Sequence, residues 1–276
     1  MMEVSEALSV VLEHSKAFVL TQEEVSLAVA LGRVLAADVR APCDLPAFRA
    51  SMKDGYALSL ATEGAEDERE YHVVGTILAG QSAEGLEPTI RPDGVYKIMT
   101  GAPVPASCNA VVMVEDTRLL ESSDDKGEIK VLIRGLKQLQ EGADVRQVGS
   151  DLQQDQVVMR QGETVGPAEL GLLSSCGITI VRVYPIPRVG VLSTGDEVID
   201  PSPGVSLQSG QIFDANRPLL RGLLQGFEST VQIVDLGIAK DDADSLRECL
   251  SQSLSQVDIL ITSGGVSMGE VDLVKQ

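Results

Sequence analysis

The last third of the chain alternates apolar, strand-like runs with helix-like segments. RVGVLS (188–193), TVQIVDLGIA (230–239) and DILITS (258–263) are short apolar runs, separated by the helix-like segments 214–227 and 242–256. A β-α-β-α-β order of this kind predicts a parallel sheet with right-handed crossovers. In open α/β sheets ligands bind outside the carboxyl ends of the strands, so the pattern also predicts where a site should lie.

Polar loops, two of them containing glycine, follow the three expected strands, and they should meet at one edge of the sheet. Glycines there let backbone N–H groups approach an anion. Carboxylates beside them suit Mg²⁺, which takes oxygen ligands and usually bridges to phosphate. The combination predicts a phosphorylated ligand together with a hard cation. The residues concerned are Thr194, Asp196, Glu197, Lys240, Asp241, Asp242, Ser263, Gly264, Gly265, Ser267, Gly269, Glu270 and Asp272.

Two common nucleotide-binding motifs are not matched at this edge. Gly264 and Gly269 have the spacing of a P-loop, but Glu270 and Val271 stand where the Lys and Ser/Thr would be. A Rossmann G-x-G-x-x-G is also missing, because Gly264 and Gly265 are adjacent. The residues alone therefore leave open whether Ser-Gly-Gly holds a ligand or only forms a strand-to-helix turn.

The first segment is predicted to be helical. Val4, Ala7, Leu8, Val11 and Leu12 follow the spacing of one helix face, which predicts a first helix. A capping-box signal, Thr21 with Glu24, then predicts a second helix over VSLAVALGRVLAADV (25–39).

The middle of the chain is predicted to be β-rich. YHVVGTIL, GVYKIMTG, AVVMVEDTRLL and EIKVLIRG are short β-type runs broken by Gly, Pro, Asn and Asp. Pro167 and Gly177 then bracket a helix that could return to the first segment. We therefore expect a multi-domain α/β protein whose β-rich part is an insertion. The expected subdomains are a discontinuous first (1–46 and 142–183), a β-rich second (47–141) and a parallel-sheet third (184–276).

Composition limits the classes of function. The formal net charge is −19, which argues against nonspecific nucleic-acid binding, since that needs a basic face. No run approaches the ~20 apolar residues of a membrane helix, and the acidic N-terminal segment is not a signal peptide. A cytoplasmic protein without membrane insertion is expected. The four cysteines have no C-x-x-C pair, so free and mostly buried thiols are expected.

Three polar residues outside the sheet edge do not predict a functional site when each is considered alone. Asp54 follows Lys53 in ASMKDGYAL, Thr100 begins TGAPVPAS, and Asp151 lies in VGSDLQ. Taken one at a time, each is better explained as a turn or cap residue than as part of a site.

Together, however, these segments resemble the MoeA family, which includes the E domains of gephyrin and of plant molybdenum-cofactor proteins. The resemblance covers essentially the whole chain. It rests on LPAFRASMKDGYAL, TGAPVPASCNAVVMVEDT, VRQVGSDL, VGPAELGLLSSCGI, VLSTGDEVID, GQIFDANRPLL and ITSGGVSMGEVDLVK, which appear in the family's order.

The resemblance implies a molybdopterin molybdotransferase, an enzyme of molybdenum cofactor biosynthesis. Such enzymes take adenylylated molybdopterin and molybdate as substrates, use Mg²⁺, and release the molybdenum cofactor and AMP. The family also implies an elongated homodimer of four-subdomain chains. Its cleft lies between the molybdopterin-binding-like third subdomain and the partner chain's second subdomain. The adenylyltransferase (G-type) domain of the same pathway is a further implied partner.

Family roles carry over onto matching positions of this sequence. The resemblance assigns catalytic roles to Asp54, Thr100, Asp151, Glu197 and Asp272, with Arg146 near Asp151. It assigns the cation to Asp272, with Asp241, Asp242 and Glu197 as further charge near it. Substrate contacts are expected from Ser263, Gly264, Gly265, Ser267, Gly269 and Asp214.

The end of the sequence departs from the family pattern. Family members continue into a lysine-bearing loop that receives molybdate and into a fourth, β-rich subdomain, neither of which is in the sequence. A C-terminally truncated molybdopterin molybdotransferase is therefore expected. It would hold the half of the site that binds the adenylate and the cation. The resemblance also implies that the third subdomain is incomplete. Two alternatives stay open. One is a gephyrin-like scaffold that clusters receptors, and the other is a plain nucleotide-binding protein.

Overall fold

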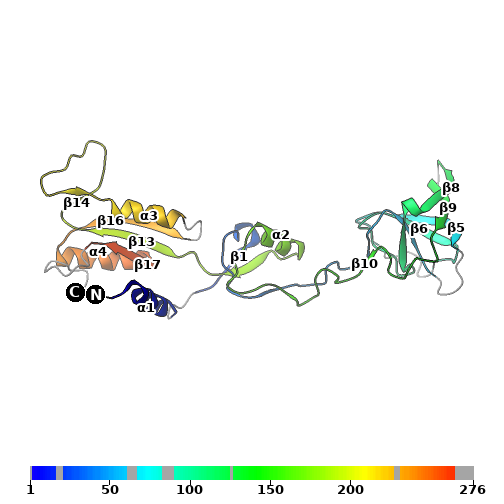
Figure 1. The fold of residues 1–276 in the computed structure, drawn as a ribbon, viewed down its shortest axis with the longest axis horizontal. Coiled ribbons are helices and arrows are strands. Elements are labelled where there is room, and N and C mark those ends of the chain that lie inside the picture. Colours follow the sequence, from blue (N-terminus) through cyan, green and yellow to red (C-terminus); the bar gives the residue numbers. More distant parts are fainter. Residues whose placement is uncertain are drawn as a thin grey trace. The chain divides into compact units, whose positions relative to one another are not determined.

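The computed structural model describes residues 2–16, 21–60, 67–82, 90–124, 127–226 and 231–264 (Figure 1). The chain divides into two compact units. Residues 39–158 form what we call the central unit. Residues 1–38 together with 159–276 form the flanking unit. The central unit is thus an insertion within the sequence of the flanking unit.

A six-stranded mixed sheet makes up most of the central unit. β5 and β6 run parallel, and every other pair of neighbouring strands is antiparallel. Smaller pairs join β3 (Ala50–Ser51) to β10 (Val145–Arg146), and β2 (Val39–Arg40) to β11 (Val157–Met159). In spatial order the sheet contains β7 (Ala110–Met113), β4 (Gly55–Leu58), β6 (Gly94–Ile98), β5 (Glu68–Ile77), β9 (Gly127–Arg134) and β8 (Thr117–Ser123), with a short 3-10 turn, η2 (Val114–Asp116), before β8.

The core of the central unit is built from aliphatic side chains and three tyrosines. One cluster gathers around Ile77, Ile98 and Val111, and another around Leu58, Val131 and Ile133. All six of these side chains are fully buried or nearly so. The prediction of β-strands in the middle of the chain is confirmed for the part of this segment that the structure describes.

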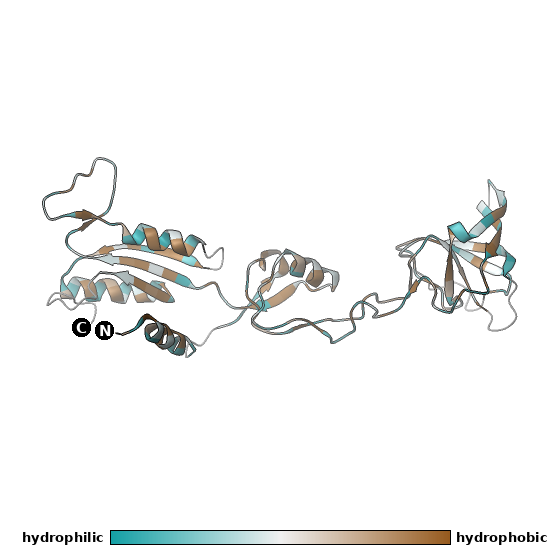
Figure 2. Ribbon diagram, viewed as in Figure 1, coloured by the Kyte–Doolittle hydropathy of each residue, from teal (hydrophilic) through white to brown (hydrophobic). Residues whose placement is uncertain are grey.

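A three-stranded parallel sheet organises the last part of the flanking unit. Its order is β16 (Gln232–Ala239), β13 (Arg188–Thr194) and β17 (Ile259–Ser263), so β13 is central. Two helices, α3 (Asn216–Gly226) and α4 (Ala243–Gln256), lie on opposite sides of the strands (Figure 1). The strands are mostly hydrophobic, whereas the helices alternate between polar and apolar residues (Figure 2). The predicted β-α-β-α-β order and the parallel pairing are confirmed.

A long excursion connects β13 to α3. It contains β14 (Val198–Ile199) and β15 (Ile212–Phe213), which pair in parallel. The intervening loop and this small pair bring the chain back to the start of α3, beside the end of β13.

The second helix predicted for the first segment is wrong. The first one is present as α1 (Val4–Lys16), but residues 25–39 hold no α-helix. Instead β1 (Glu23–Ser26) pairs antiparallel with β12 (Ile180–Val183), and the short 3-10 turn η1 (Leu27–Val29) follows.

Tertiary pairing explains the failed helix prediction. Leu35 is fully buried and bridges Val183, and Val34 bridges Thr164. Glu24 accepts a hydrogen bond from Arg182 at 3.1 Å rather than completing a capping box. Local helix propensity is a weak preference that such long-range contacts readily override.

The helix predicted between Pro167 and Gly177 is confirmed. It is α2 (Pro167–Ser175), with the proline in its first turn. Gly177 follows the helix with φ of 72°, the left-handed conformation that glycine adopts freely at helix ends. The Glu169 carboxylate accepts the Gly166 N–H at 3.0 Å and so closes the amino-terminal end.

All four cysteines are free thiols, as expected. Cys108 and Cys176 are buried, Cys249 is partly buried and Cys43 is exposed. Among the residues that the structure describes, no helix is both long and apolar enough to span a membrane.

Candidate functional site

The sheet of the flanking unit brings the starts of the three predicted loops together. In the parallel register, Ser193 lies opposite Ser263, and Thr194 lies opposite Ala239. The loops that begin at Gly195, Lys240 and Gly264 therefore leave from one edge of the sheet. The predicted convergence at the carboxyl ends of the strands is confirmed for these first residues.

Gly264 has no room for a side chain. Its φ is 93°, and a Cβ atom would lie 2.6 Å from the Thr194 carbonyl oxygen and 2.7 Å from Thr194 Oγ1. The same Thr194 hydroxyl donates to the Ser263 carbonyl oxygen at 3.4 Å. The end of β17 thus packs its backbone directly on the end of β13, which only glycine permits.

The Ser263 hydroxyl is held from a third element. Asn216, the first residue of α3, directs its Nδ2 atom to Ser263 Oγ at 2.9 Å. Sequence reasoning passed over Asn216. The available signal was its place in DANRP, at the start of an expected helix.

The carboxylates at this edge have separate surroundings. Glu197 turns back over Gly195, whose Cβ position would lie 2.5 Å from Glu197 Oε2. The Asp241 N–H donates to Asp196 Oδ1 at 3.4 Å. The Asp242 carboxylate caps α4 by accepting the Ser245 N–H at 2.9 Å, and the pKa of Asp242 is lowered by this backbone hydrogen bond.

No complete metal site is formed by these groups. Within 2–16, 21–60, 67–82, 90–124, 127–226 and 231–264, no three His, Cys, Asp or Glu side chains are grouped closely enough to hold an ion. Gly265, Ser267, Gly269 and Asp272 lie outside the described residues.

Asp214, predicted to touch substrate, lies in the interior beneath α3. Its side chain is 2% exposed, and it accepts hydrogen bonds from Ser193 Oγ at 3.1 Å and from Arg217 Nε at 2.9 Å. Burial raises its pKa, but the bonds from Arg217 and Ser193 outweigh burial, so the pKa is lowered. Arg217 also pairs with Asp200 and Asp235. Asp214 thus anchors the start of α3.

In the central unit, Asp54 and Thr100 are brought together. Asp54 Oδ1 accepts two hydrogen bonds from Thr100, one from the backbone N–H at 2.7 Å and one from the hydroxyl at 2.8 Å. The backbone bond is the larger cause, and both lower the pKa of Asp54. An exposed carboxylate held in this way stays ionised at neutral pH.

The Thr100 hydroxyl gives a direct test of this pairing. In Thr100→Val the backbone N–H donor remains but the hydroxyl donor is lost, so the pKa of Asp54 should rise toward its ordinary value. The titration is followed by the carboxyl ¹³C shift of Asp54. Thr117→Val is the matched control, because the Thr117 hydroxyl donates to the Val114 carbonyl at 2.7 Å instead. An Asp54 pKa that is the same in both variants would contradict the assignment.

Asp151 and Arg146 form an ion pair, also in the central unit. Arg146 Nε lies 3.1 Å from Asp151 Oδ1, and its Nη2 bonds the other carboxylate oxygen. Both side chains are about half exposed. The pairing of these two residues agrees with the arginine expected beside Asp151.

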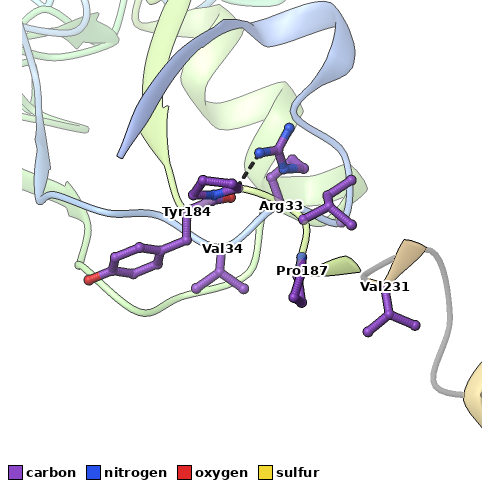
Figure 3. Close-up of a pocket in the computed structure, with 8 residues that line it drawn as sticks. Arg33, Val34, Tyr184, Pro187 and Val231 are labelled. Carbon is purple, nitrogen blue, oxygen red and sulfur yellow. Dashed lines mark hydrogen bonds between the residues drawn. The ribbon is translucent and has the colours of Figure 1, made fainter. Parts of the chain in front are cut away.

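Two cavities lie at the opposite, amino-terminal ends of the strands. One of about 430 Å³ is lined by Arg33, Val34, Tyr184, Pro187 and Val231, among others (Figure 3). Arg33 Nη2 donates there to the Tyr184 carbonyl at 2.8 Å. The other, of about 590 Å³, lies between α1 and the start of β17. Neither is lined by a predicted site residue, and ligands of open α/β sheets bind at the carboxyl ends.

Two family models together match most of the chain. Residues 2–177 match "MoeA N-terminal region (domain I and II)", and residues 190–276 match "Probable molybdopterin binding domain". The first match alone covers more than half of the chain. The chain belongs to the MoeA family.

Named relatives agree with this membership. Gephyrin from Dictyostelium discoideum is 35% identical, with an alignment that takes in 100% of this chain and 39% of gephyrin. Molybdopterin molybdenumtransferase from Haemophilus influenzae is 34% identical, covering 100% of this chain and 64% of the enzyme. The chain therefore spans less than two thirds of the length of these MoeA-family relatives.

A solved MoeA-family structure has the same mixed α/β fold. The crystal structure of the molybdopterin biosynthesis MoeA protein from Pyrococcus horikoshii matches with a TM-score of 0.75 at 29% identity. The match covers 94% of this chain and 63% of that chain. The resemblance to the family and the coarse fold class expected from the sequence are both confirmed. The boundaries of the three expected subdomains stay a prediction.

Proposed function

We propose that this chain carries part of a molybdopterin molybdotransferase. It would bind adenylylated molybdopterin at the carboxyl edge of the β16–β13–β17 sheet and take part in cleaving the adenylate, which releases AMP. The observation that carries the proposal is the edge itself. Thr194, Ser263 and Gly264 meet there with backbone in close contact, inside the segment that matches a molybdopterin-binding domain.

The chemistry suits donors placed at this edge. Cleavage of a phosphoanhydride builds negative charge on the departing phosphate, and fixed hydrogen-bond donors stabilise such charge. The Ser263 hydroxyl is one such donor, and Gly264 presents backbone with no side chain in front of it. With a net charge of −19, the chain has to offset repulsion of anionic substrates locally.

We also propose that Mg²⁺ accompanies the substrate. The carboxylates near the edge are of the oxygen-ligand type that Mg²⁺ prefers, with Glu197 and Asp241 next to the strand ends. Mg²⁺ in phosphate sites is usually held by one or two carboxylates plus the substrate's own phosphates, so a dense cluster of protein ligands is not required. Asp242 is a weaker candidate, because its carboxylate caps α4. Asp272 completes the proposed set.

Asp54 is the proposed acid–base group of the central unit. Because its pKa is lowered by Thr100, it is ionised at neutral pH and accepts protons or cations rather than donating a proton. Asp151, whose charge is balanced by the ion pair with Arg146, is proposed to orient the substrate. The homodimer and a partnership with the pathway's adenylyltransferase domain are proposed for the whole protein.

The central test is AMP release by this chain. With adenylylated molybdopterin, molybdate and Mg²⁺, Asp54→Asn should lower the rate of AMP release about 100-fold or more, a typical loss for a general acid–base group. The fold should be unaffected, because Asp54 is exposed and its amide replacement can still accept from Thr100.

Asp124→Asn is the matched control for this test. Asp124 is an exposed aspartate at the end of β8, and its replacement should leave AMP release unchanged. Equal rates for Asp54→Asn and the unmodified chain would rule out the acid–base role. Binding of AMP with Mg²⁺, but no turnover of the adenylylated pterin in any variant, would favour the plain nucleotide-binding alternative.

A further inference from the structure

Asn216 and Ser263 are joined by a hydrogen bond that crosses from α3 to β17. Asn216 Nδ2 lies 2.9 Å from Ser263 Oγ, although the two residues are 47 positions apart in the chain. Asn216 is exposed and Ser263 is half-buried, so a ligand at the strand ends can reach the Ser263 hydroxyl.

The Asn216 side of this bond rests on a fixed support. Next to Asn216, the Arg217 N–H donates to Asp214 Oδ1 at 3.1 Å. The Arg217 guanidinium is 6% exposed and pairs with Asp214, Asp200 and Asp235. The first turn of α3 is therefore tied to the interior, and Asn216 projects from it in a defined place.

The Ser263 side is equally constrained. Its carbonyl oxygen accepts from Thr194 Oγ1 at 3.4 Å, and the adjacent Gly264 packs on the Thr194 backbone. The backbone of Ser263 is thus set by β13. Only the orientation of its side-chain hydroxyl is left to be determined, and Asn216 bonds that hydroxyl.

The direction of the bond decides what the hydroxyl can do. A serine hydroxyl has one hydrogen to donate and two lone pairs that accept. Because Asn216 donates, it occupies a lone pair, and the hydroxyl hydrogen must point elsewhere. That hydrogen is then free for an anionic oxygen outside the strand ends.

We propose that Asn216 is a positioning residue that aims the Ser263 hydroxyl at a phosphate oxygen of the bound adenylate. The inference rests on the proposed function, because it takes the adenylate to be the ligand of this edge. Asn216 does not itself need to touch the ligand. Replacing Asn216 should therefore change ligand binding only while Ser263 is present. This dependence on Ser263 distinguishes a positioning role from a purely structural one.

A double-mutant cycle tests this dependence, with titration calorimetry of AMP in the presence of Mg²⁺. Asn216→Ala and Ser263→Ala should each weaken AMP binding about 3- to 10-fold, the effect of one lost hydrogen bond. The double variant should bind no more weakly than Ser263→Ala alone, since Asn216 then has nothing to orient.

Asn216→Asp gives an independent and sharper readout. The carboxylate would accept the Ser263 hydrogen and turn it away from the ligand, so AMP binding should fall below that of Asn216→Ala. A structural role predicts the reverse order, because an acidic residue at a helix amino terminus is favourable. Melting temperatures should be no lower for Asn216→Asp than for Asn216→Ala.

Gln225→Ala is the matched control, since it removes an exposed amide from the last turn of the same helix and should leave AMP binding unchanged. Additive losses in the double variant, or stronger binding by Asn216→Asp than by Asn216→Ala, would overturn the role of Asn216 while the proposed function stands. Failure of the unmodified chain to bind AMP would overturn both.

Discussion

Gly55→Ala should destabilise the central unit by about 3 kcal/mol or more. The new methyl group would collide with backbone atoms, so no side chain could move aside to make room for it. A Cβ atom on Gly55 would lie 1.9 Å from the Val112 carbonyl oxygen and 2.8 Å from the Val112 carbonyl carbon. Gly55 pairs with Met113 in the β4–β7 ladder and with Ile98 in the β4–β6 ladder. The backbone of β4 would have to move away from that of β7, the strand at the edge of the sheet.

Tyrosine gives a direct probe of this unit. The chain has no tryptophan and four tyrosines, and Tyr56, Tyr71 and Tyr96 all lie in the core of the central unit. Urea unfolding followed by tyrosine fluorescence should show a lower midpoint for Gly55→Ala with a similar slope. Since Gly55 follows Asp54 directly, the variant should also disturb the Asp54–Thr100 pair.

Gly75→Ala is the matched control for this prediction. Gly75 belongs to β5 of the same sheet, and its Cβ would lie 3.4 Å from the Tyr96 ring, an ordinary van der Waals contact. Its effect should stay within about 1 kcal/mol. If both variants unfold at the same urea concentration, the close approach of β4 to β7 cannot be as tight as the structure has it.

The sequence predicted those parts of the fold that local pattern controls. The alternation after residue 187 predicts three parallel strands and two helices, because each apolar run is short and each helix keeps its own period. Residues 25–39 also carry a local helix signal, yet they form part of β1, η1, turns and isolated bridges. There the outcome depends on Val183 and Thr164, more than a hundred positions away, which no local window contains.

The candidate site likewise has a part that the sequence predicts and a part that it does not predict. Strand ends in a parallel sheet must share an edge, so the meeting of Thr194 and Ser263 could be predicted. The sequence did not predict which side chains would be buried in the interior. The family resemblance assigns Asp214 a substrate contact, which stays a prediction, and the structure places its side chain in a buried network with Arg217. Asn216, two positions further on, reaches the exposed edge instead.

Arg217→Ala should cost the flanking unit about 3–5 kcal/mol, the usual penalty for leaving a buried charge without its partner. The Arg217 side chain is 6% exposed and that of Asp214 is 2% exposed, and the guanidinium lies 2.9 Å from Asp214 and 2.8 Å from Asp200. Among the residues that the structure describes, Ser193 is then the one side chain that still donates to Asp214. Its charge would be stranded in the interior beside a cavity.

The loss should depend on pH in a defined direction. In the unmodified protein the pKa of Asp214 is lowered, because bonds from Arg217 and Ser193 outweigh burial. That stabilisation is present above the unfolded Asp pKa of about 3.9 and is lost as the pH falls through the folded pKa. Without Arg217, burial should raise the pKa instead, and protonation would then relieve the penalty. The stability difference between the two proteins should therefore shrink in acid.

Arg221→Ala is the control that separates the effect of burial from the effect of losing a positive charge. Arg221 is on the same helix and shares Asp235 with Arg217, but its side chain is 40% exposed. An exposed pair of this kind is worth about 1 kcal/mol or less. All four α-helices of the described residues belong to the flanking unit, so helical circular dichroism reports its unfolding. Equal losses for the two variants would mean that Arg217 acts as a surface charge. A loss confined to Arg217→Ala would show that the buried network holds the first turn of α3, and with it Asn216, at the edge of the sheet.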